Sequence, residues 1–238
     1  MLRELLAGAH DEFRRLGAAI VGGHTIEGPS TLMGFTVLAR QITKPLVKSG
    51  LRPGDQLVLT KPLGTGVLLA AHMRNRCRGP WFVELCRNMQ LGNEICLELA
   101  KRYAIEGMTD VTGFGLAGHL LEMLDASQVR ATIELNNIPL LPGSLELSAD
   151  GIESSLAPDN RANESRIGIS AQSLDRAQFQ LLFDPQTCGG MLFGVSPRDV
   201  DGVLSELVRA GFSQARNIGR VLESSPLSGS RSTIDIVG

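Results

Sequence analysis

Residues 108–120 read MTDVTGFGLAGHL and place one carboxylate, Asp110, and three glycines at the start of an amphipathic helical pattern. This arrangement suits a divalent cation that carries a polyphosphate. The carboxylate holds the metal, while free backbone N–H groups and the helix dipole favour phosphate oxygens. The same residues also fit a strand-to-helix turn in which Asp110 is solvated or caps the backbone. Other segments of the chain bear on the choice between these two interpretations.

The composition is that of an ordinary globular protein. The 238 residues are enough for one large domain or two small ones, and 43% of them are hydrophobic and 20% charged. Aromatic residues make up only 4%, so the core must rest on Leu, Ile, Val and Ala. Many of the 27 glycines stand in runs beside polar residues, which predicts tight turns or backbone close to a ligand.

Charge and hydropathy argue against several kinds of partner. The net charge is −2 and no basic stripe is present, so we expect no nucleic acid partner. No apolar run approaches the roughly 20 residues that span a bilayer, so we expect no membrane association. The four cysteines lack C-x-x-C spacing, which argues against a zinc knot or a dithiol redox site. With no signal-peptide pattern at the N-terminus, a cytoplasmic protein with reduced thiols is expected.

The hydrophobic pattern predicts alternating helices and strands. Expected helices cover residues 1–16, 65–76, 81–103 with a break near Gly92, the segment after the Asp110 turn, and 199–210. Expected strands cover residues 18–21, 31–40, 56–60, 131–135, 180–183, 191–195, 216–222 and 232–237. Residues 148–172 lack periodicity and predict a long loop or flap. Because no strict strand–helix–strand repeat is present, we expect an α+β fold, a layered α/β/α sandwich around a mixed sheet.

The segment Gly22-Gly23-His24-Thr25 follows the apolar run 18–21. Its glycines can present backbone N–H groups to an anion without interference from a Cβ atom. His24 is then placed to contact a phosphate or a ribose, and Thr25 to donate a hydroxyl. A hairpin turn with a surface histidine is the alternative interpretation.

Two further glycine-rich segments are less specific. Residues 61–66, KPLGTG, superficially resemble a phosphate loop, but Lys61 precedes the glycines and the G-x-x-x-x-G-K-S/T spacing is absent. Residues 184–190, DPQTCGG, predict a rigid turn in which Asp184 is able to cap the local backbone. Cys188 has no His or Lys within a few residues, which favours a structural role over a reactive thiol.

The histidines form no recognisable catalytic set. His10 and His72 fall on predicted helices without ligand-like partners and are expected at the surface. His119 is expected to pack, because it stands beside Leu120 in the apolar helical pattern. No Ser/His/Asp arrangement and no pair of His at metal-ligand spacing can be assembled.

Taken together, four segments closely resemble selenophosphate synthetase (selenide, water dikinase). They run in family order and are AAIVGGHTIEGP at 18–29, LTKPLGTGVLLAA at 59–71, MTDVTGFGLAGHLLEM at 108–123 and DPQTCGGMLFGV at 184–195. The matches cover nearly the whole chain, and the last two motifs are the most specific. The resemblance implies the C-terminal-domain fold of a superfamily that includes aminoimidazole ribonucleotide synthetase, thiamine-phosphate kinase and a hydrogenase maturation factor.

The resemblance also implies an activity and a site. The family is a group of phosphotransferases that convert selenide, ATP and water to selenophosphate, AMP and phosphate. In family terms Asp110 looks like a Mg²⁺ ligand. The segment Gly22-Gly23-His24-Thr25 looks like an ATP-phosphate loop contributed across the interface of a homodimer.

The chain departs from the family at its N-terminus. Family members begin with further residues that hold the catalytic Cys or selenocysteine, a nearby Lys and other metal-binding aspartates. Residues 1–43 therefore look like the last helix and strand of the N-terminal ATP-binding domain, and 44–238 like the C-terminal domain. We expect exposed apolar surface and self-association or disorder near 1–43, and negligible selenide-dependent ATP hydrolysis by this chain alone. The intact gene product could also be fused to an NADH dehydrogenase-like flavoprotein, as in some bacteria.

Two other kinds of function stay open. A non-catalytic nucleotide-binding module predicts saturable binding of ATP or AMP with magnesium. A synthetase or kinase for another small metabolite of the same superfamily would be identified by substrate screening. Cys188, which replaces the family's usual Ser in D-P-Q-T-S-G-G, does not distinguish these possibilities.

Overall fold

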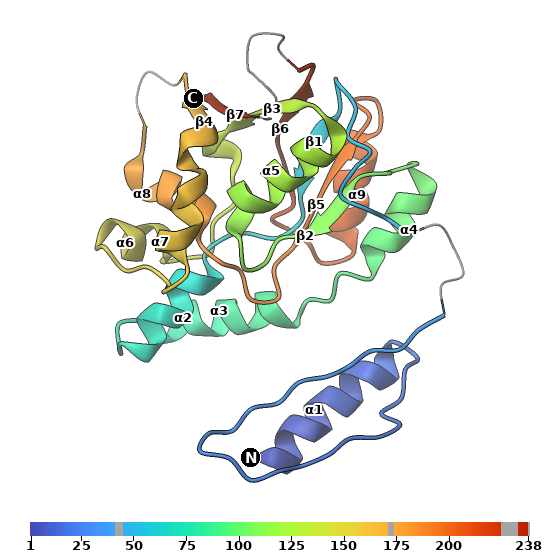
Figure 1. Cartoon of the computed structure of the whole chain (residues 1–238), viewed down its shortest axis with the longest axis vertical. Helices are drawn as coiled ribbons and strands as arrows, with labels where there is room; N and C mark the ends of the chain where they lie inside the picture. The colour runs from blue at the N-terminus through green and yellow to red at the C-terminus, as the bar shows by residue number, and fades with distance from the viewer. Residues whose placement is uncertain (41–44, 171–173, 225–232, 238) are drawn as a thin grey trace. The chain divides into compact units, whose positions relative to one another are not determined.

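The computed structural model describes residues 1–40, 45–170, 174–224 and 233–237. Its contacts divide the chain into two units, Met1–Thr43 and Lys44–Gly238. The described part of the first unit holds one helix, and that of the second holds the sheet and the other helices (Figure 1).

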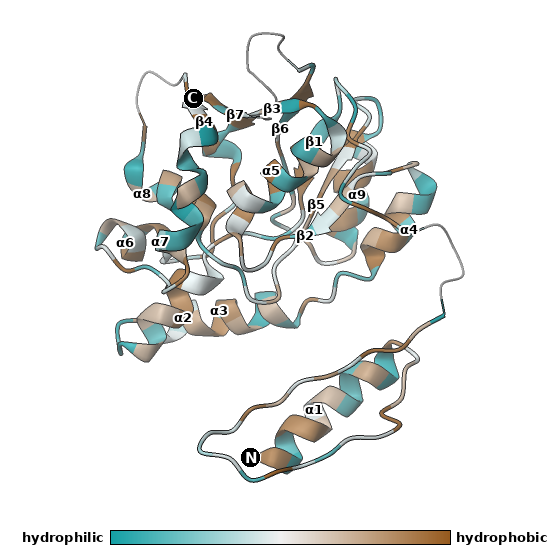
Figure 2. Cartoon of the chain, in the orientation of Figure 1, coloured by the Kyte–Doolittle hydropathy of each residue, from teal (hydrophilic) through white to brown (hydrophobic). Residues whose placement is uncertain are grey.

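The first unit has little regular structure. Its helix α1 (Leu2–Arg15) carries both hydrophobic and hydrophilic residues (Figure 2), and none of them is buried. Residues 18–40 form neither helix nor strand, so the predictions of strands at 18–21 and 31–40 are wrong. The apolar side chains in this stretch stay exposed, as at Leu32, which is 90% accessible. A strand needs a paired backbone and a buried face, and this unit supplies neither to these residues.

The second unit is built on a mixed sheet, with seven strands among the described residues in the order β2-β5-β1-β6-β3-β7-β4. The strands are β1 (Gln56–Leu59), β2 (Met108–Asp110), β3 (Arg130–Glu134), β4 (Ile167–Ile169), β5 (Met191–Val195), β6 (Arg216–Leu222) and β7 (Ile234–Val237). β1 pairs antiparallel with β5 and β6, whereas β7 pairs parallel with β3 and β4. The predicted mixed sheet is confirmed.

Alternating side chains give the central strands two apolar faces. Leu57 and Leu59 of β1 join the core on one face, and Val58 joins the core on the other. The covering helices are α5 (Gly115–Ser127) on the first face and α4 (Ile95–Arg102) with α9 (Val200–Arg209) on the second. Helices therefore cover both faces of the sheet, which confirms the predicted α/β/α sandwich.

A third apolar cluster lies beside the sandwich. It joins α2 (Thr65–Met73), α3 (Gly79–Gln90) and α6 (Ser144–Ala149). The remaining short elements are α7 (Ala157–Asn160), α8 (Arg176–Gln180), η1 (Leu135–Asn137), η2 (Arg161–Arg166) and η3 (Leu181–Phe183). No helix in the described part of the chain is long and apolar enough to cross a bilayer.

Most predicted elements of the second unit are present, with two exceptions. The helical stretch 81–103 is broken near Gly92 as predicted, between α3 and α4. The predicted loop 148–172 instead contains α7, η2 and β4, and its residues 171 and 172 lie outside the described residues, as does 232 of the last strand. The predicted strand 180–183 is helical. Gln180 ends α8, which Asp175 starts by accepting hydrogen bonds from two backbone N–H groups, and Leu181–Phe183 form η3.

Candidate metal and nucleotide site

Asp110 ends β2 at the edge of the sheet, and its side chain is exposed. The turn 111–114 leads directly into α5, which begins at Gly115. Gly115 has a φ of +69°, and an added Cβ would lie 2.8 Å from the backbone of Phe183. Only glycine fits both conditions. The sequence therefore forms the strand, turn and helix expected around Asp110.

Backbone contacts tie this turn to the DPQTCGG segment. Val111 N donates a hydrogen bond to Gly190 O at 2.8 Å, and Gln186 N donates to Thr112 O at 2.9 Å. A Cβ on Gly189 would lie 1.9 Å from Val111 O, so a side chain at this position is excluded. The backbone that carries Asp110 is thus held by a segment remote in the sequence.

The DPQTCGG segment also caps α2. Gln186 Oε1 accepts hydrogen bonds from the backbone N–H groups of Gly64 at 3.1 Å and Thr65 at 3.2 Å. Asp184 Oδ2 accepts from Gly66 N at 3.0 Å. Burial raises the pKa of Asp184 to about 7, although these hydrogen bonds oppose the rise. Asp184 thus caps a distant helix, and the prediction that it caps the local backbone is wrong.

Lys61 lies buried after the end of β1, with 2% of its surface exposed. Its Nζ donates to the backbone oxygens of Cys188, at 3.0 Å, and of Leu91. Burial lowers the pKa of this amine. Cys188 is itself exposed and has a φ of +50°. Lys61 therefore supports the backbone of the DPQTCGG segment, a role that its sequence neighbours do not reveal.

The segment Gly22-Gly23-His24-Thr25 belongs to the first unit, whereas Asp110 belongs to the second. All four residues are exposed, and a Cβ on either glycine would meet no atom within 4 Å. The strands that a hairpin turn would join are absent from the described residues 18–40. The segment has the open backbone that contact with an anion requires, and its binding role stays a prediction.

Asp110 supplies one carboxylate and not a complete metal cage. Across the described residues, no three or more His, Cys, Asp or Glu side chains are grouped so that they could hold a metal ion. Mg²⁺ commonly keeps several waters and binds one or two carboxylates together with substrate phosphates. Asp110 therefore fits Mg²⁺ as one ligand of a site shared with phosphate.

The histidines lie as predicted. His10 and His72 are exposed, and the His72 ring stacks on Phe82 at a centroid distance of 4.1 Å. His119 is buried within α5, with 4% of its surface exposed. Packing of His119 is thus confirmed, and its polar contacts concern the turn that follows Asp110.

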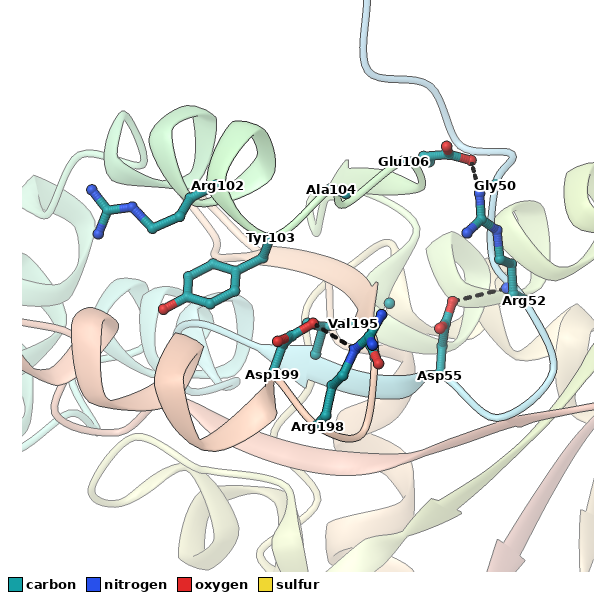
Figure 3. Close-up of a pocket in the computed structure, with 12 residues that line it drawn as sticks. Gly50, Arg52, Asp55, Arg102, Tyr103, Ala104, Glu106, Val195, Arg198 and Asp199 are labelled. Carbon is teal, nitrogen blue, oxygen red and sulfur yellow. Dashed lines mark hydrogen bonds and ion pairs between the residues drawn. The ribbon is translucent and has the colours of Figure 1, made fainter.

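A cavity lies at the other end of the central strands from Asp110, as the register of β5 with β1 and β2 shows. Its volume is about 490 Å³, and three arginines and three acidic residues line it (Figure 3). Arg52 pairs with Glu106 at 2.8 Å, and Arg198 with Asp199 at 3.7 Å. The lining therefore holds equal numbers of basic and acidic side chains, and two of these ion pairs lie within it.

The fold and the Asp110 turn are those of a known class of proteins. Residues 52–230 match AIR synthase related protein, C-terminal domain, and the chain belongs to this family. The solved structure of tt0281 from Thermus thermophilus is 19% identical with a TM-score of 0.60, covering 98% of this chain and 64% of that one. Thiamine-monophosphate kinase from Stenotrophomonas maltophilia K279a is 14% identical with a TM-score of 0.52, covering 80% and 52%. At these identities the similarity shows the fold alone.

Curated relatives show which group within this class the chain resembles in sequence identity over its length. Selenide, water dikinase of Nitratidesulfovibrio vulgaris (strain DSM 19637 / Miyazaki F) is 37% identical over 230 residues, covering 95% of this chain and 65% of the relative. The enzyme of the same name from Dechloromonas aromatica (strain RCB) is 34% identical, covering 94% and 64%. The resemblance that the four motifs predict is confirmed. The chain spans slightly less than two thirds of the length of these relatives.

Proposed function

We propose that this chain contributes to an ATP-dependent phosphotransferase that forms selenophosphate, AMP and phosphate from selenide, ATP and water. The 37% identity to a selenide, water dikinase supports the proposal. The structural observation that carries it is the exposed Asp110 carboxylate, which stands directly before a glycine turn and the start of α5.

In this proposal Asp110 holds Mg²⁺ together with the phosphates of ATP. α5 has 13 residues, and the positive end of its dipole lies at Gly115, close in sequence to the carboxylate. A helix N-terminus favours phosphate oxygens because its first N–H groups have no helical acceptor. Bound Mg²⁺ would neutralise phosphate charge, and phosphoryl transfer depends mainly on such neutralisation and on positioning. Asp110 would fix where the cation sits.

The segment Gly22-Gly23-His24-Thr25 is proposed to contact ATP phosphates across the interface of a homodimer. Its support is the match to the family motif and the open backbone at both glycines. Thr25 would donate its hydroxyl, and His24 would contact a phosphate or the ribose. Residues 1–43 then belong to the ATP-binding part of the enzyme.

The substitution Asp110→Asn tests the metal site. It keeps the size of the side chain and removes its charge, so Mn²⁺ binding in the presence of ATP should weaken by about tenfold or more. Relaxation of water protons by bound Mn²⁺ measures this affinity. Asp201→Asn is the matched control, because Asp201 is an exposed carboxylate on α9 and should leave binding unchanged. Equal Mn²⁺ affinities in the natural protein, Asp110→Asn and Asp201→Asn would show that Asp110 is not a ligand of the cation.

A nucleotide-binding module without catalysis is a second candidate, favoured by the single carboxylate at the Asp110 turn. Calorimetry with Mg²⁺ and ATP at millimolar concentration should show saturable binding under both proposals. A chimera separates them, in which this chain follows the part of the Nitratidesulfovibrio enzyme that it does not match. Selenide-dependent AMP formation by the chimera supports the phosphotransferase, and nucleotide binding without AMP formation supports the module.

A further inference from the structure

A chain of four polar side chains runs from the Asp110 turn along α5 to Lys48, all within the second unit. Thr112 Oγ1 lies 3.2 Å from His119 Nε2, and His119 Nδ1 lies 3.3 Å from Glu122 Oε2. Lys48 Nζ pairs with the same Glu122 oxygen at 2.6 Å. The proposed metal site at Asp110 does not by itself require a histidine at this position. Packing in the core would also be satisfied by an apolar side chain, which would not link a hydroxyl to a carboxylate.

The surroundings of His119 decide which ring nitrogen carries the proton. Burial lowers the pKa of His119 and favours the neutral ring, although Glu122 opposes this; Lys48 also lowers the pKa, and Asp110 raises it. A neutral imidazole has one N–H donor and one acceptor. The Glu122 carboxylate beside Nδ1 is an acceptor only, so the proton belongs on Nδ1 and Nε2 is left as an acceptor.

The contact between His119 and Glu122 is close but not aligned as a hydrogen bond. Nδ1 is buried without an aligned partner, and the Glu122 oxygen at 3.3 Å is the acceptor within reach. Glu122 is 41% exposed at its side chain, and Lys48 holds the same carboxylate oxygen at 2.6 Å.

The hydroxyl of Thr112 then has a defined direction. Its proton points to His119 Nε2, which leaves the lone pairs of Oγ1 available on the remaining sides. The backbone of Thr112 is already fixed, because its carbonyl accepts the hydrogen bond from Gln186 N at 2.9 Å. A free hydroxyl would rotate, whereas this one is held two residues after Asp110.

We propose that His119, oriented by Glu122, is a positioning residue that presents the Thr112 oxygen to the cation and phosphate held at Asp110. This inference rests on the proposed function, because it needs a ligand at the Asp110 turn. His119 itself touches neither substrate nor metal. Its effect passes through the direction of one hydroxyl group, which distinguishes it from a residue that only fills the core.

The ring proton provides a first test that requires no metal. The sequence contains four histidines, so ¹⁵N-histidine spectra at neutral pH are simple, and the His119→Gln variant assigns the missing signal. The neutral ring with its proton on Nδ1 is the expected form. A proton on Nε2, or a doubly protonated ring, would overturn the proposal, because Nε2 could no longer accept from Thr112.

Metal affinity provides the second test, with Mn²⁺ and ATP as probes. Thr112→Val removes the hydroxyl and should weaken Mn²⁺ binding by about tenfold, and His119→Leu should weaken it similarly. Thr112→Ser keeps the hydroxyl and should bind as the natural protein does. His119→Gln should bind Mn²⁺ more tightly than His119→Leu and nearly as tightly as the natural protein, because its amide oxygen can accept a hydrogen bond from Thr112. The double variant Thr112→Val/His119→Leu should be no weaker than either single one.

The outcomes separate this inference from the proposed function. If the unsubstituted protein binds no Mn²⁺, the proposed metal site at Asp110 fails. If it binds Mn²⁺ and neither Thr112→Val nor His119→Leu weakens it, the positioning role fails while the metal site stands. Unfolding followed by the fluorescence of Trp81, the one tryptophan of the sequence, confirms that each variant is folded. Additive losses in the double variant would also contradict the proposal.

Discussion

The Asp110 turn and the Gly22–Thr25 segment are both rich in glycine and follow apolar residues, yet their surroundings differ. The Asp110 turn stands between β2 and α5 and is hydrogen-bonded to the DPQTCGG segment. Most residues of α5 are buried. The Gly22–Thr25 segment lies in irregular, exposed backbone, and a Cβ added to Gly22 or Gly23 would meet no atom within 4 Å.

The comparison shows two different uses of glycine. At Gly115 and Gly189 the missing side chain lets another backbone approach, so the geometry of the Asp110 turn exists without a ligand. At Gly22 and Gly23 the missing side chain leaves the backbone open. That segment has no packing of its own to fix its shape, and we expect a ligand or a partner subunit to do so.

The largest expected difference concerns a buried and an exposed leucine. Leu120 of α5 is 0% exposed, and Leu120→Ala should lower the free energy of unfolding by about 2–5 kcal/mol. Leu32 is 90% exposed, and Leu32→Ala should change it by less than about 0.5 kcal/mol. Urea unfolding followed by Trp81 fluorescence measures both. A comparable loss in Leu32→Ala would show that the first unit stabilises the second.

Asp184, in the DPQTCGG segment, should make the free energy of unfolding of the protein depend on pH. Its folded pKa of about 7 lies above the ordinary value of 3.8, so the folded protein binds the proton more tightly. Relative to Asp184→Asn, the natural protein should lose stability as pH rises from about 4 to about 7, by on the order of a few kcal/mol. The loss should be absent below this range and constant above it.

The matched control for this pH dependence is Asp11→Asn in the exposed helix α1. The Asp11 side chain is 81% exposed, so its removal should leave the pH profile of unfolding unchanged. Urea unfolding at a series of pH values measures all three proteins. Parallel profiles for the natural protein and Asp184→Asn would show that Asp184 has the same pKa in the folded and unfolded states.

A smaller difference is expected between two glycines. Gly189→Ala would place a Cβ 1.9 Å from Val111 O, and the shift that relieves this contact should cost about 1–3 kcal/mol. Gly23→Ala meets no atom within 4 Å and should leave unfolding nearly unchanged. Urea midpoints report the difference. Tolerance of alanine at 189 would mean that the turn is less tightly held than the structure shows.

The main elements of the second unit could be predicted because their signals are local. Apolar spacing predicts β1, α5, β5 and α9, and the break between α3 and α4 falls near Gly92. The strand predicted at 31–40 is wrong because apolar composition does not supply a pairing partner. The loop predicted at 148–172 is wrong because short helices and a three-residue strand, β4, carry too little periodicity to detect.

The candidate site was only partly predictable. The sequence singles out Asp110 through its own neighbours, and the structure exposes that carboxylate at the end of β2, before the turn into α5. The contact of Lys61 with Cys188 joins residues 127 apart, and the bond of Gln186 to Gly64 joins residues 122 apart. Spacing along the chain carries no signal for such pairs.

By itself the sequence determined the family, the layered α/β/α fold and the carboxylate that precedes the turn into α5, because these depend on short motifs and local periodicity. Only the tertiary structure decided what surrounds that carboxylate. It placed the DPQTCGG segment against the Asp110 turn and set His119 between Thr112 and Glu122. The physical reason is that burial and hydrogen-bond partners arise where distant segments meet, and they determine which groups are charged, fixed or open to a ligand.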